Sequence, residues 1–252
     1  MPVYKANTLV LHRTNLGETD KILTLLSRES GKLSAVAKGA RGPKSKLSGA
    51  TELFTHSKML LATGKSLDIV SQGEIRESFP ALRDDLALMT RATYLCELTD
   101  RFVEEREPNQ DVFDLLLSAL YLLQRRTDEP DVIVHAFELR LLTERGYAPH
   151  LDACVRCGAA LLRARVGFSP SLGGLLCAAD RFSVDDTISI TAETVEFMRA
   201  LLAGEAHEVV GLRPSAVALR ETARCLRWYI RYRTERDLKS AEFLEMLRLT
   251  AG

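Results

Sequence analysis

The N-terminal part of the chain shows the pattern of short β-strands. Segments rich in Val, Ile, Leu and Thr are separated by turns that contain Gly or Pro. This pattern predicts strands at residues 3–12, 21–28, 32–37, 52–62 and 67–75. Five short strands in such a short segment fit a small closed barrel, and the five-stranded OB-fold is the most economical barrel of this kind. An SH3-like barrel is an alternative that the same pattern permits.

The apolar positions change to a helical period after Pro80. Two stripes at spacings of three and four residues predict two helices. The first stripe consists of Leu88, Ala92, Leu95, Thr99 and Phe102, and the second of Phe113, Leu116, Leu117, Leu120 and Leu123. A third helix is expected from the acidic cluster at residues 128–131 to Gly146. Later helices are expected at residues 191–202 and after Pro214.

Four residues with metal-binding side chains have the spacing of a zinc ribbon. They are Cys154, Cys157, Cys177 and Asp180. Each of two tight turns would supply two ligands of a tetrahedron, and four protein ligands leave no position for a catalytic water. We therefore expect zinc as a structural cofactor. Asp180 replaces the expected fourth cysteine and is a weaker structural ligand than a thiolate, so His150 and Asp152 are alternative fourth ligands. A loop packed without metal is the competing interpretation.

These patterns together predict an α+β multidomain protein. An N-terminal five-stranded OB-fold barrel would be followed by an α-helical domain with an inserted zinc-ribbon-like module. The chain of 252 residues is long enough to form more than one core. The expected domains are an OB-fold nucleic-acid-binding domain at residues 1–80, a helical domain at residues 81–150 and 183–252, and a zinc-finger-like module at residues 151–182.

Cysteine usage and hydropathy predict the compartment. The chain has five cysteines, an odd number, and Cys96 and Cys225 stand alone within helical patterns, where we expect them in the core. This usage fits a reducing compartment better than a disulfide framework. No apolar run approaches the length of a membrane span, and the N-terminus lacks the apolar region of a signal peptide. We expect a cytoplasmic, nucleoid-associated protein without a membrane partner.

Charge is unevenly distributed along a chain whose formal net charge is zero. Residues 1–80 carry twelve Lys and Arg against seven acids, and residues 211–252 carry nine against five. Residues 81–150 carry eight against fourteen, and residues 151–210 carry five against eight. The net charge alone would argue weakly against a nucleic-acid partner. The two basic ends are nevertheless consistent with one.

The loop between the third and fourth predicted strands is strongly basic. It reads KGARGPKSK at residues 38–46 and contains four cations, no acid and three Gly or Pro residues. Positive charge and an accessible backbone suit contacts with a phosphate backbone, although a merely solvated loop would look the same. The predicted DNA-binding residues are Arg28, Lys32, Lys38, Arg41, Lys44 and Lys46. Few aromatic residues lie nearby in the sequence, so base stacking at this loop is less secure.

A second cationic pattern lies in the helix that follows Pro214. Arginines at helical spacing run parallel to an apolar stripe of Leu219, Ala223, Leu226 and Ile230. The predicted partner-binding residues are Arg220, Arg224, Arg227 and Arg231. Guanidinium groups bind phosphate and carboxylate by paired hydrogen bonds, so the ligand could be nucleic acid or an acidic peptide. A solvated helix face is the simplest alternative, since arginine favours helices.

Several strings, in this order, resemble the bacterial RecO family of recombination mediators. They are GETDKIL at residues 17–23, GKLSAVAKGAR at residues 31–41, FELRLLTERGYAP at residues 137–149, the Cys154-x-x-Cys157-Gly158 motif, GGLLC at residues 173–177 and RDLKS at residues 236–240. The resemblance covers nearly the whole chain. Each string alone is weak, but their order is specific.

The resemblance implies an OB-fold joined to a helical domain that carries a zinc finger. It also implies a non-catalytic protein that binds single- and double-stranded DNA and anneals complementary strands. With the partner RecR, such proteins help RecA load onto DNA coated by single-stranded DNA-binding protein, whose acidic tail they contact. Two other functions compete with this hypothesis. One is a zinc-dependent nucleic-acid enzyme, although the ligand motif of base deaminases is missing. The other is an RNA-binding zinc-ribbon protein of the translation apparatus.

Overall fold

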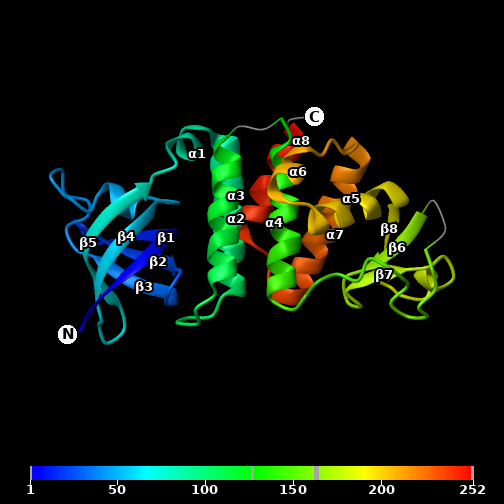
Figure 1. Ribbon diagram of the computed structural model, residues 1–252, viewed down its shortest axis with the longest axis horizontal. Helices are drawn as coiled ribbons and strands as arrows, with labels where there is room; N and C mark the ends of the chain where they lie inside the picture. The colour runs from blue at the N-terminus through cyan, green and yellow to red at the C-terminus, as the bar shows by residue number, and fades with distance from the viewer. Residues whose placement is uncertain (1, 126–127, 162–164, 251–252) are drawn as a thin grey trace. The chain divides into compact units, whose positions relative to one another are not determined.

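The computed structural model describes residues 2–125, 128–161 and 165–250. It divides into two compact units (Figure 1). One unit comprises Met1–Arg125 with Glu242–Gly252, and the other comprises Arg126–Ala241. No helix among the described residues has both the length and the apolar character that crossing a membrane requires.

The first unit contains the predicted five-stranded barrel. Its strands are β1 (Val3–Leu16), β2 (Asp20–Ser27), β3 (Gly31–Ala37), β4 (His56–Ala62) and β5 (Asp68–Glu77). Their order is β1-β2-β3-β5-β4, and the pairing of β1 with β4 closes the barrel. The strands alternate buried and exposed positions, so that Leu23, Leu25, Leu33, Met59 and Leu61 fill the interior. The sequence prediction of an OB-like barrel is confirmed.

Two strand boundaries differ from the sequence prediction by four residues, and the others by at most two. β1 continues to Leu16 because it pairs with β2 to the end of a hairpin whose turn contains Gly17 at φ +57°. The fourth strand begins at His56 and not at residue 52. A short 3-10 helix at Gly49–Thr51 precedes it, and Thr55 donates to the carbonyl of Glu52. This turn takes up the residues that sequence alone assigned to the strand.

Helices complete the first unit. They are α1 (Pro80–Asp84), α2 (Leu86–Phe102), α3 (Gln110–Gln124) and most of α8 (Lys239–Thr250). Asp85 caps α2 by accepting from the amides of Ala87 and Leu88, and Asn109 caps α3 by accepting from Val112. The predicted stripe of α2 is buried, as is that of α3 except for the half-buried Leu117.

The second unit combines helices with a small sheet. The helices are α4 (Pro130–Glu144), α5 (Ala192–Ala203), α6 (Ala206–Gly211) and α7 (Ala216–Thr234). The strands are β6 (Arg165–Ser169), β7 (Gly174–Leu176) and β8 (Ile188–Thr191), in the antiparallel order β7-β6-β8. α4 is buried along most of its length, with Val134, Phe137, Leu139 and Leu141 in the core. It contacts α5, α6 and α7, so it forms the centre of this unit.

Candidate metal centre and nucleic-acid surfaces

The first knuckle is a tight turn that Gly158 makes possible. Its φ of +71° lies in the left-handed region, where a glycine is favoured. The amide of Gly158 donates to the carbonyl of Cys154 at 2.8 Å, and the amide of Cys154 donates to the carbonyl of Ala159 at 3.0 Å. These bonds fold the chain back on itself and bring the side chains of Cys154 and Cys157 to the same side.

The second knuckle directly follows β7. Cys177 comes after the last residue of that strand, and Asp180 opens a short 3-10 helix that ends at Phe182. The amide of Val155 donates to the carbonyl of Leu175 at 2.9 Å, which ties the two knuckles together. This backbone bond therefore helps to fix the relative position of the ligands.

The four predicted ligands form one cluster, with their ligand atoms within 4.8 Å of one another. Oδ2 of Asp180 lies 3.3 Å from Sγ of both Cys154 and Cys177, and the Sγ atoms of Cys157 and Cys177 are 3.8 Å apart. In a tetrahedral zinc site, ligand atoms are separated by about 3.5 to 3.8 Å. The distances fit a zinc ion held by three sulfurs and one oxygen.

The alternative fourth ligands lie outside this group. Among the described residues, the cluster of metal-binding side chains contains neither His150 nor Asp152. Asp152 is exposed and lies 3.8 Å from the guanidinium of Arg199. The structure therefore brings Asp180 to the cluster, and the cluster could hold a metal ion.

The surroundings of Cys154 favour its thiolate. Burial opposes the charge, but backbone amides of Cys177, Cys157 and Arg156 donate to the sulfur and lower the pKa of Cys154. Hydrogen bonds from Cys157, Cys154 and Cys177 lower the pKa of Asp180. The nearby Asp180 raises the pKa of Cys157 to about 12. A divalent cation bound here would displace the thiol protons, because zinc is held by thiolates.

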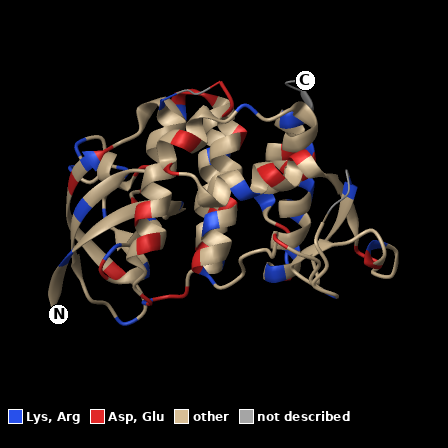
Figure 2. Cartoon of the chain, turned by 45° about the vertical axis from the view of Figure 1, so that its right-hand side comes forward, with Lys and Arg blue, Asp and Glu red and all other residues tan. Residues whose placement is uncertain are grey.

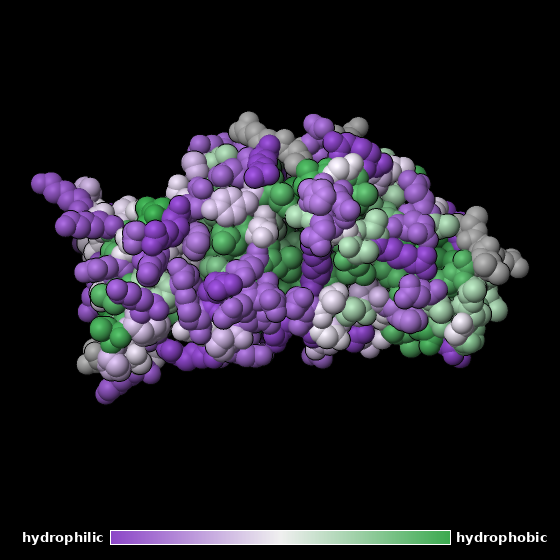
Figure 3. Space-filling view, viewed as in Figure 1, coloured by the Kyte–Doolittle hydropathy of each residue, from purple (hydrophilic) through white to green (hydrophobic). Residues whose placement is uncertain are grey.

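The basic barrel loop presents its cations to solvent. Lys38, Arg41, Lys44 and Lys46 are all exposed. The side chain of Ala40 is buried and anchors the loop. Two backbone hydrogen bonds also hold it: the amide of Gly42 donates to the carbonyl of Gly39, and the amide of Arg41 donates to the carbonyl of Thr19. Lys and Arg are blue in Figure 2, and Figure 3 shows hydrophilic side chains projecting from the barrel. The fold therefore holds the backbone of the loop while its charges stay accessible.

A polar hollow of about 700 Å³ adjoins this loop. It is lined by His12, Arg13, Thr14, Asn15, Lys21, Ala40, Arg41, Ser48 and Glu52. Arg13 and the buried Lys21 both contact Glu52, at 2.7 and 2.9 Å. Sequence reasoning missed these cations, because Arg13 and Lys21 look like ordinary strand positions and their carboxylate partner is far away in the sequence.

Two of the six predicted DNA-binding residues have carboxylate partners within their own unit. Arg28 makes a paired contact with Asp114, with distances of 3.0 Å from Nε and 2.8 Å from Nη2. Nζ of Lys32 lies 3.2 Å from Oδ1 of Asp100 and donates to its carbonyl at 2.7 Å. These acids offset much of the charge that the two cations would offer to a phosphate. Their role in DNA binding stays a prediction, and a weaker one than that of the loop.

The predicted arginines of the C-terminal stripe lie on the outer side of α7. Arg220, Arg224 and Arg231 are exposed, and Arg227 is half-buried. The parallel apolar stripe does not form a groove beside them, because Leu226 and Ile230 are buried in the core of the second unit. The exposed large apolar side chains on α7 include Val217, Trp228 and Tyr232.

Comparisons with known proteins place the chain in a family. The model of the family described as "Recombination protein O N terminal" matches residues 1–79, and that of "Recombination protein O C terminal" matches residues 83–242. A DNA repair protein RecO of Symbiobacterium thermophilum is 41% identical over 250 residues, which cover 98% of this chain and 99% of the relative. DNA repair protein RecO of Bifidobacterium adolescentis is 38% identical over 248 residues, which cover 97% of this chain and 100% of the relative. These matches over nearly the full length show that the chain belongs to the RecO family of DNA repair proteins.

Proposed function

We propose that this chain is a non-catalytic, DNA-binding recombination mediator. It binds single- and double-stranded DNA, anneals complementary strands and assists the loading of RecA on protein-coated single-stranded DNA. Family membership supports a role in recombinational repair. The observation that carries the DNA-binding part is the barrel loop, with four exposed cations and no acid between residues 38 and 46.

The loop is suited to bind the phosphates of nucleic acid irrespective of the base sequence. Within the part of the chain that the structure describes, Lys44 and Lys46 form no ion pair, so their charges are available to phosphates. Contacts between lysine and phosphate carry no sequence information. A protein that anneals any pair of complementary strands needs this kind of binding, because it must accept every sequence.

Zinc, in this proposal, has a structural role in the second unit. The four side chains of the cluster would fill a tetrahedron around zinc and would leave no position for a reacting water, which argues against a zinc-dependent nucleic-acid enzyme. The proposed partners are DNA, a RecR-type mediator and the acidic tail of single-stranded DNA-binding protein. Cytoplasmic, nucleoid-associated localisation follows from these partners.

A pair of matched variants tests the role of the loop. Lys44→Ala with Lys46→Ala removes two exposed charges from the loop, while Lys5→Ala with Lys65→Ala removes two exposed charges from elsewhere on the same barrel. If each loop lysine neutralises one phosphate, the slope of log affinity against log salt falls by about 1.4 for single strands and about 1.8 for duplex. Binding of labelled oligonucleotides at several salt concentrations measures both slopes.

The control pair Lys5→Ala with Lys65→Ala distinguishes direct contact between the loop and DNA from the overall electrostatic field of the barrel. We expect its slopes to stay near those of the unaltered protein. Equal losses in both pairs would contradict the loop as the contact surface. A protein that binds RNA much more tightly than either form of DNA, or that does not accelerate annealing of complementary DNA strands, would contradict the proposed function itself.

A further inference from the structure

α7 is a strongly basic helix with an unusual division of charge. Its nineteen residues include five arginines and only one acid, Glu221. The distribution of these charges around the helix decides what the exposed face can bind. The single acid would weaken binding of an anion if it lay on the same face as the arginines.

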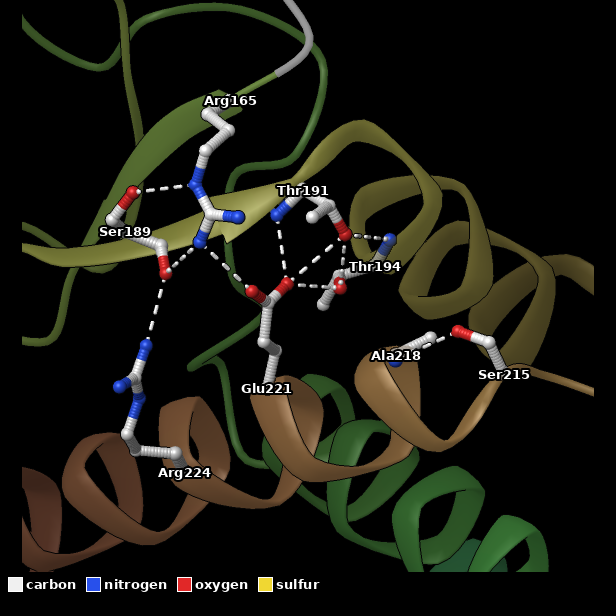
Figure 4. Close-up of polar contacts among 8 residues, drawn as sticks. All are labelled: Arg165, Ser189, Thr191, Thr194, Ser215, Ala218, Glu221 and Arg224. Carbon is white, nitrogen blue, oxygen red and sulfur yellow. Dashed lines mark hydrogen bonds and ion pairs between the residues drawn. The ribbon is translucent and has the colours of Figure 1, made fainter.

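Glu221 faces inward and is fully engaged (Figure 4). Its Oε2 accepts from the amide of Thr191 at 2.7 Å and from the hydroxyl of Thr194 at 2.5 Å, at the start of α5. Its Oε1 lies 3.0 Å from Nη2 of Arg165 on β6. Burial opposes its charge, but the hydrogen bonds from Thr194 and Thr191 and the charge of Arg165 outweigh burial and lower the pKa of Glu221. Glu221 therefore does not offset the charges of Arg220 and Arg224 on the outer face of α7.

The outer face combines fixed arginines with exposed aromatic rings. Arg224 donates to the carbonyl of Ser189 on β8 at 2.9 Å (Figure 4). The guanidinium of Arg231 lies 5.2 Å from the centre of the Trp228 ring and 3.4 Å from Asp237. Trp228 is 49% exposed and Tyr232 is 52% exposed. Because these two residues are four positions apart, their rings lie on one side of the helix, about one turn from each other.

We propose that the outer face of α7, consisting of Arg220, Arg224, Trp228, Arg231 and Tyr232, binds single-stranded DNA. Bases stack on the rings of Trp228 and Tyr232. The phosphates are contacted by Arg220 and Arg224, which form no ion pair among the described residues, whereas Asp237 offsets the charge of Arg231. This inference rests on the DNA-binding function proposed above and adds a second contact surface that distinguishes single strands from duplex. In a duplex the faces of the bases are already stacked on each other, so the rings have nothing to stack against.

The same observations favour DNA over an acidic peptide. A peptide with an apolar end needs a hydrophobic pocket bordered by cations. Here the apolar stripe of α7 is occupied by the core, since Leu226 and Ile230 are almost fully buried. Two half-exposed flat rings between arginines match the alternation of bases and phosphates along a single strand.

The protein contains a single tryptophan, so its intrinsic fluorescence reports on Trp228 directly. Titration with oligothymidine should quench the emission at saturation, because a stacked base contacts the indole ring. Duplex DNA of the same length should bind with little quenching. Affinity is measured independently from the anisotropy of the labelled oligonucleotide. If the oligonucleotide binds but the emission is unchanged, this surface is excluded while the proposed function stands. If no DNA binds at all, the proposed function itself fails.

Substitutions at Trp228 distinguish stacking from simple apolar contact. Trp228→Leu keeps a helix-forming apolar side chain but removes the ring, and Trp228→Phe keeps a ring. Loss of one stacked base should weaken single-strand binding about five-fold or more in Trp228→Leu, with most of the affinity retained in Trp228→Phe. Phe243→Ala, which removes an exposed ring from α8, is the control and should change little. Equal affinity in the Leu and Phe variants would overturn the proposal. Loss of acidic-peptide binding in Trp228→Leu, with single-strand affinity unchanged, would assign the face to the peptide instead.

Discussion

The barrel loop and the outer face of α7 carry similar charge but differ in how that charge is held. In the loop, Lys38, Lys44 and Lys46 extend from turns, and the loop at residues 38–46 contains no aromatic residue. On α7, Arg224 and Arg231 are held by specific partners beside exposed rings. A flexible cation recognises only charge, whereas a fixed ring also recognises the face of a base.

This difference predicts two separable components of DNA binding. The loop should supply a component that depends steeply on salt and is similar for single strands and duplex. α7 should supply a component that depends less on salt and favours single strands. The proposed annealing activity would benefit from both components, because the protein would bind single strands first and then release a duplex.

Loss of the metal site should have the largest effect. Of the two DNA-binding surfaces, it should weaken only the outer face of α7. β7 leads directly into Cys177, and β6 joins β7 to β8, whose Ser189 fixes Arg224. Because metal affinity is coupled to folding, Cys157→Ser should lower Tm by at least about 5 °C and abolish stoichiometric zinc. Trp228 quenching by oligothymidine should weaken in this variant, while the salt-dependent component from the barrel loop persists. Elemental analysis, thermal unfolding and the fluorescence titration measure these effects.

Two further variants control for this result. Cys225→Ala removes a buried thiol of the same unit that lies outside the cluster, and its zinc content should be unchanged. Asp180→Cys should bind zinc as well as the native chain or better, because it supplies a fourth thiolate. Stoichiometric zinc in a protein that lacks Cys154, Cys157 and Cys177 would refute the assignment of the site.

The next largest effect is expected from Glu221, whose hydrogen bonds and ion pair should contribute to the stability of the second unit. Glu221→Gln keeps the size of the side chain but removes the charge that accepts from Thr191, Thr194 and Arg165. Hydrogen bonds to a charged group are strong, so the variant should lose about 2 kcal/mol of unfolding free energy at neutral pH. Chemical denaturation measures this loss. An unchanged stability would mean that Glu221 does not hold β8, α5 and α7 together.

The same variant has a defined pH dependence. The pKa of Glu221 is lowered in the folded state from its ordinary value of 4.5. Its contribution is therefore fully present above about pH 5 and is lost as the pH falls through the folded-state pKa. The difference in stability between the native chain and Glu221→Gln should be constant from about pH 5 to 8 and should shrink below about pH 4. A difference that grows on acidification would contradict the lowered pKa.

Local pattern was sufficient to predict the strands of the barrel and the metal cluster, because residue type and spacing along the chain mark both. Strand alternation gives the interior of the barrel, and the spacing of Cys154 and Cys157 with Cys177 and Asp180 gives the cluster. Partners far apart in the sequence could not be predicted. Asp114 is 86 residues from Arg28, and Glu221 is 30 residues from Thr191. The sequence shows that these charges exist, but the fold decides which of them are already paired.

The smallest expected effect comes from ion pairing in the first unit. It is tested by comparing a cation that has a carboxylate partner with one that has none. Arg28 forms a paired contact with Asp114, and Lys44 forms no ion pair among the described residues. Lys44→Ala should therefore lower the salt slope of single-strand binding by about 0.7, whereas Arg28→Ala should change it by much less. Asp114→Asn provides the decisive third measurement. If Arg28 lies along the path of the DNA and is only masked, the loss of its partner should release one cation and raise the slope by up to about 0.7. An unchanged slope in Asp114→Asn would show that Arg28 is not part of the DNA-binding surface. The loop at residues 38–46 would then be the part of the barrel that contacts DNA.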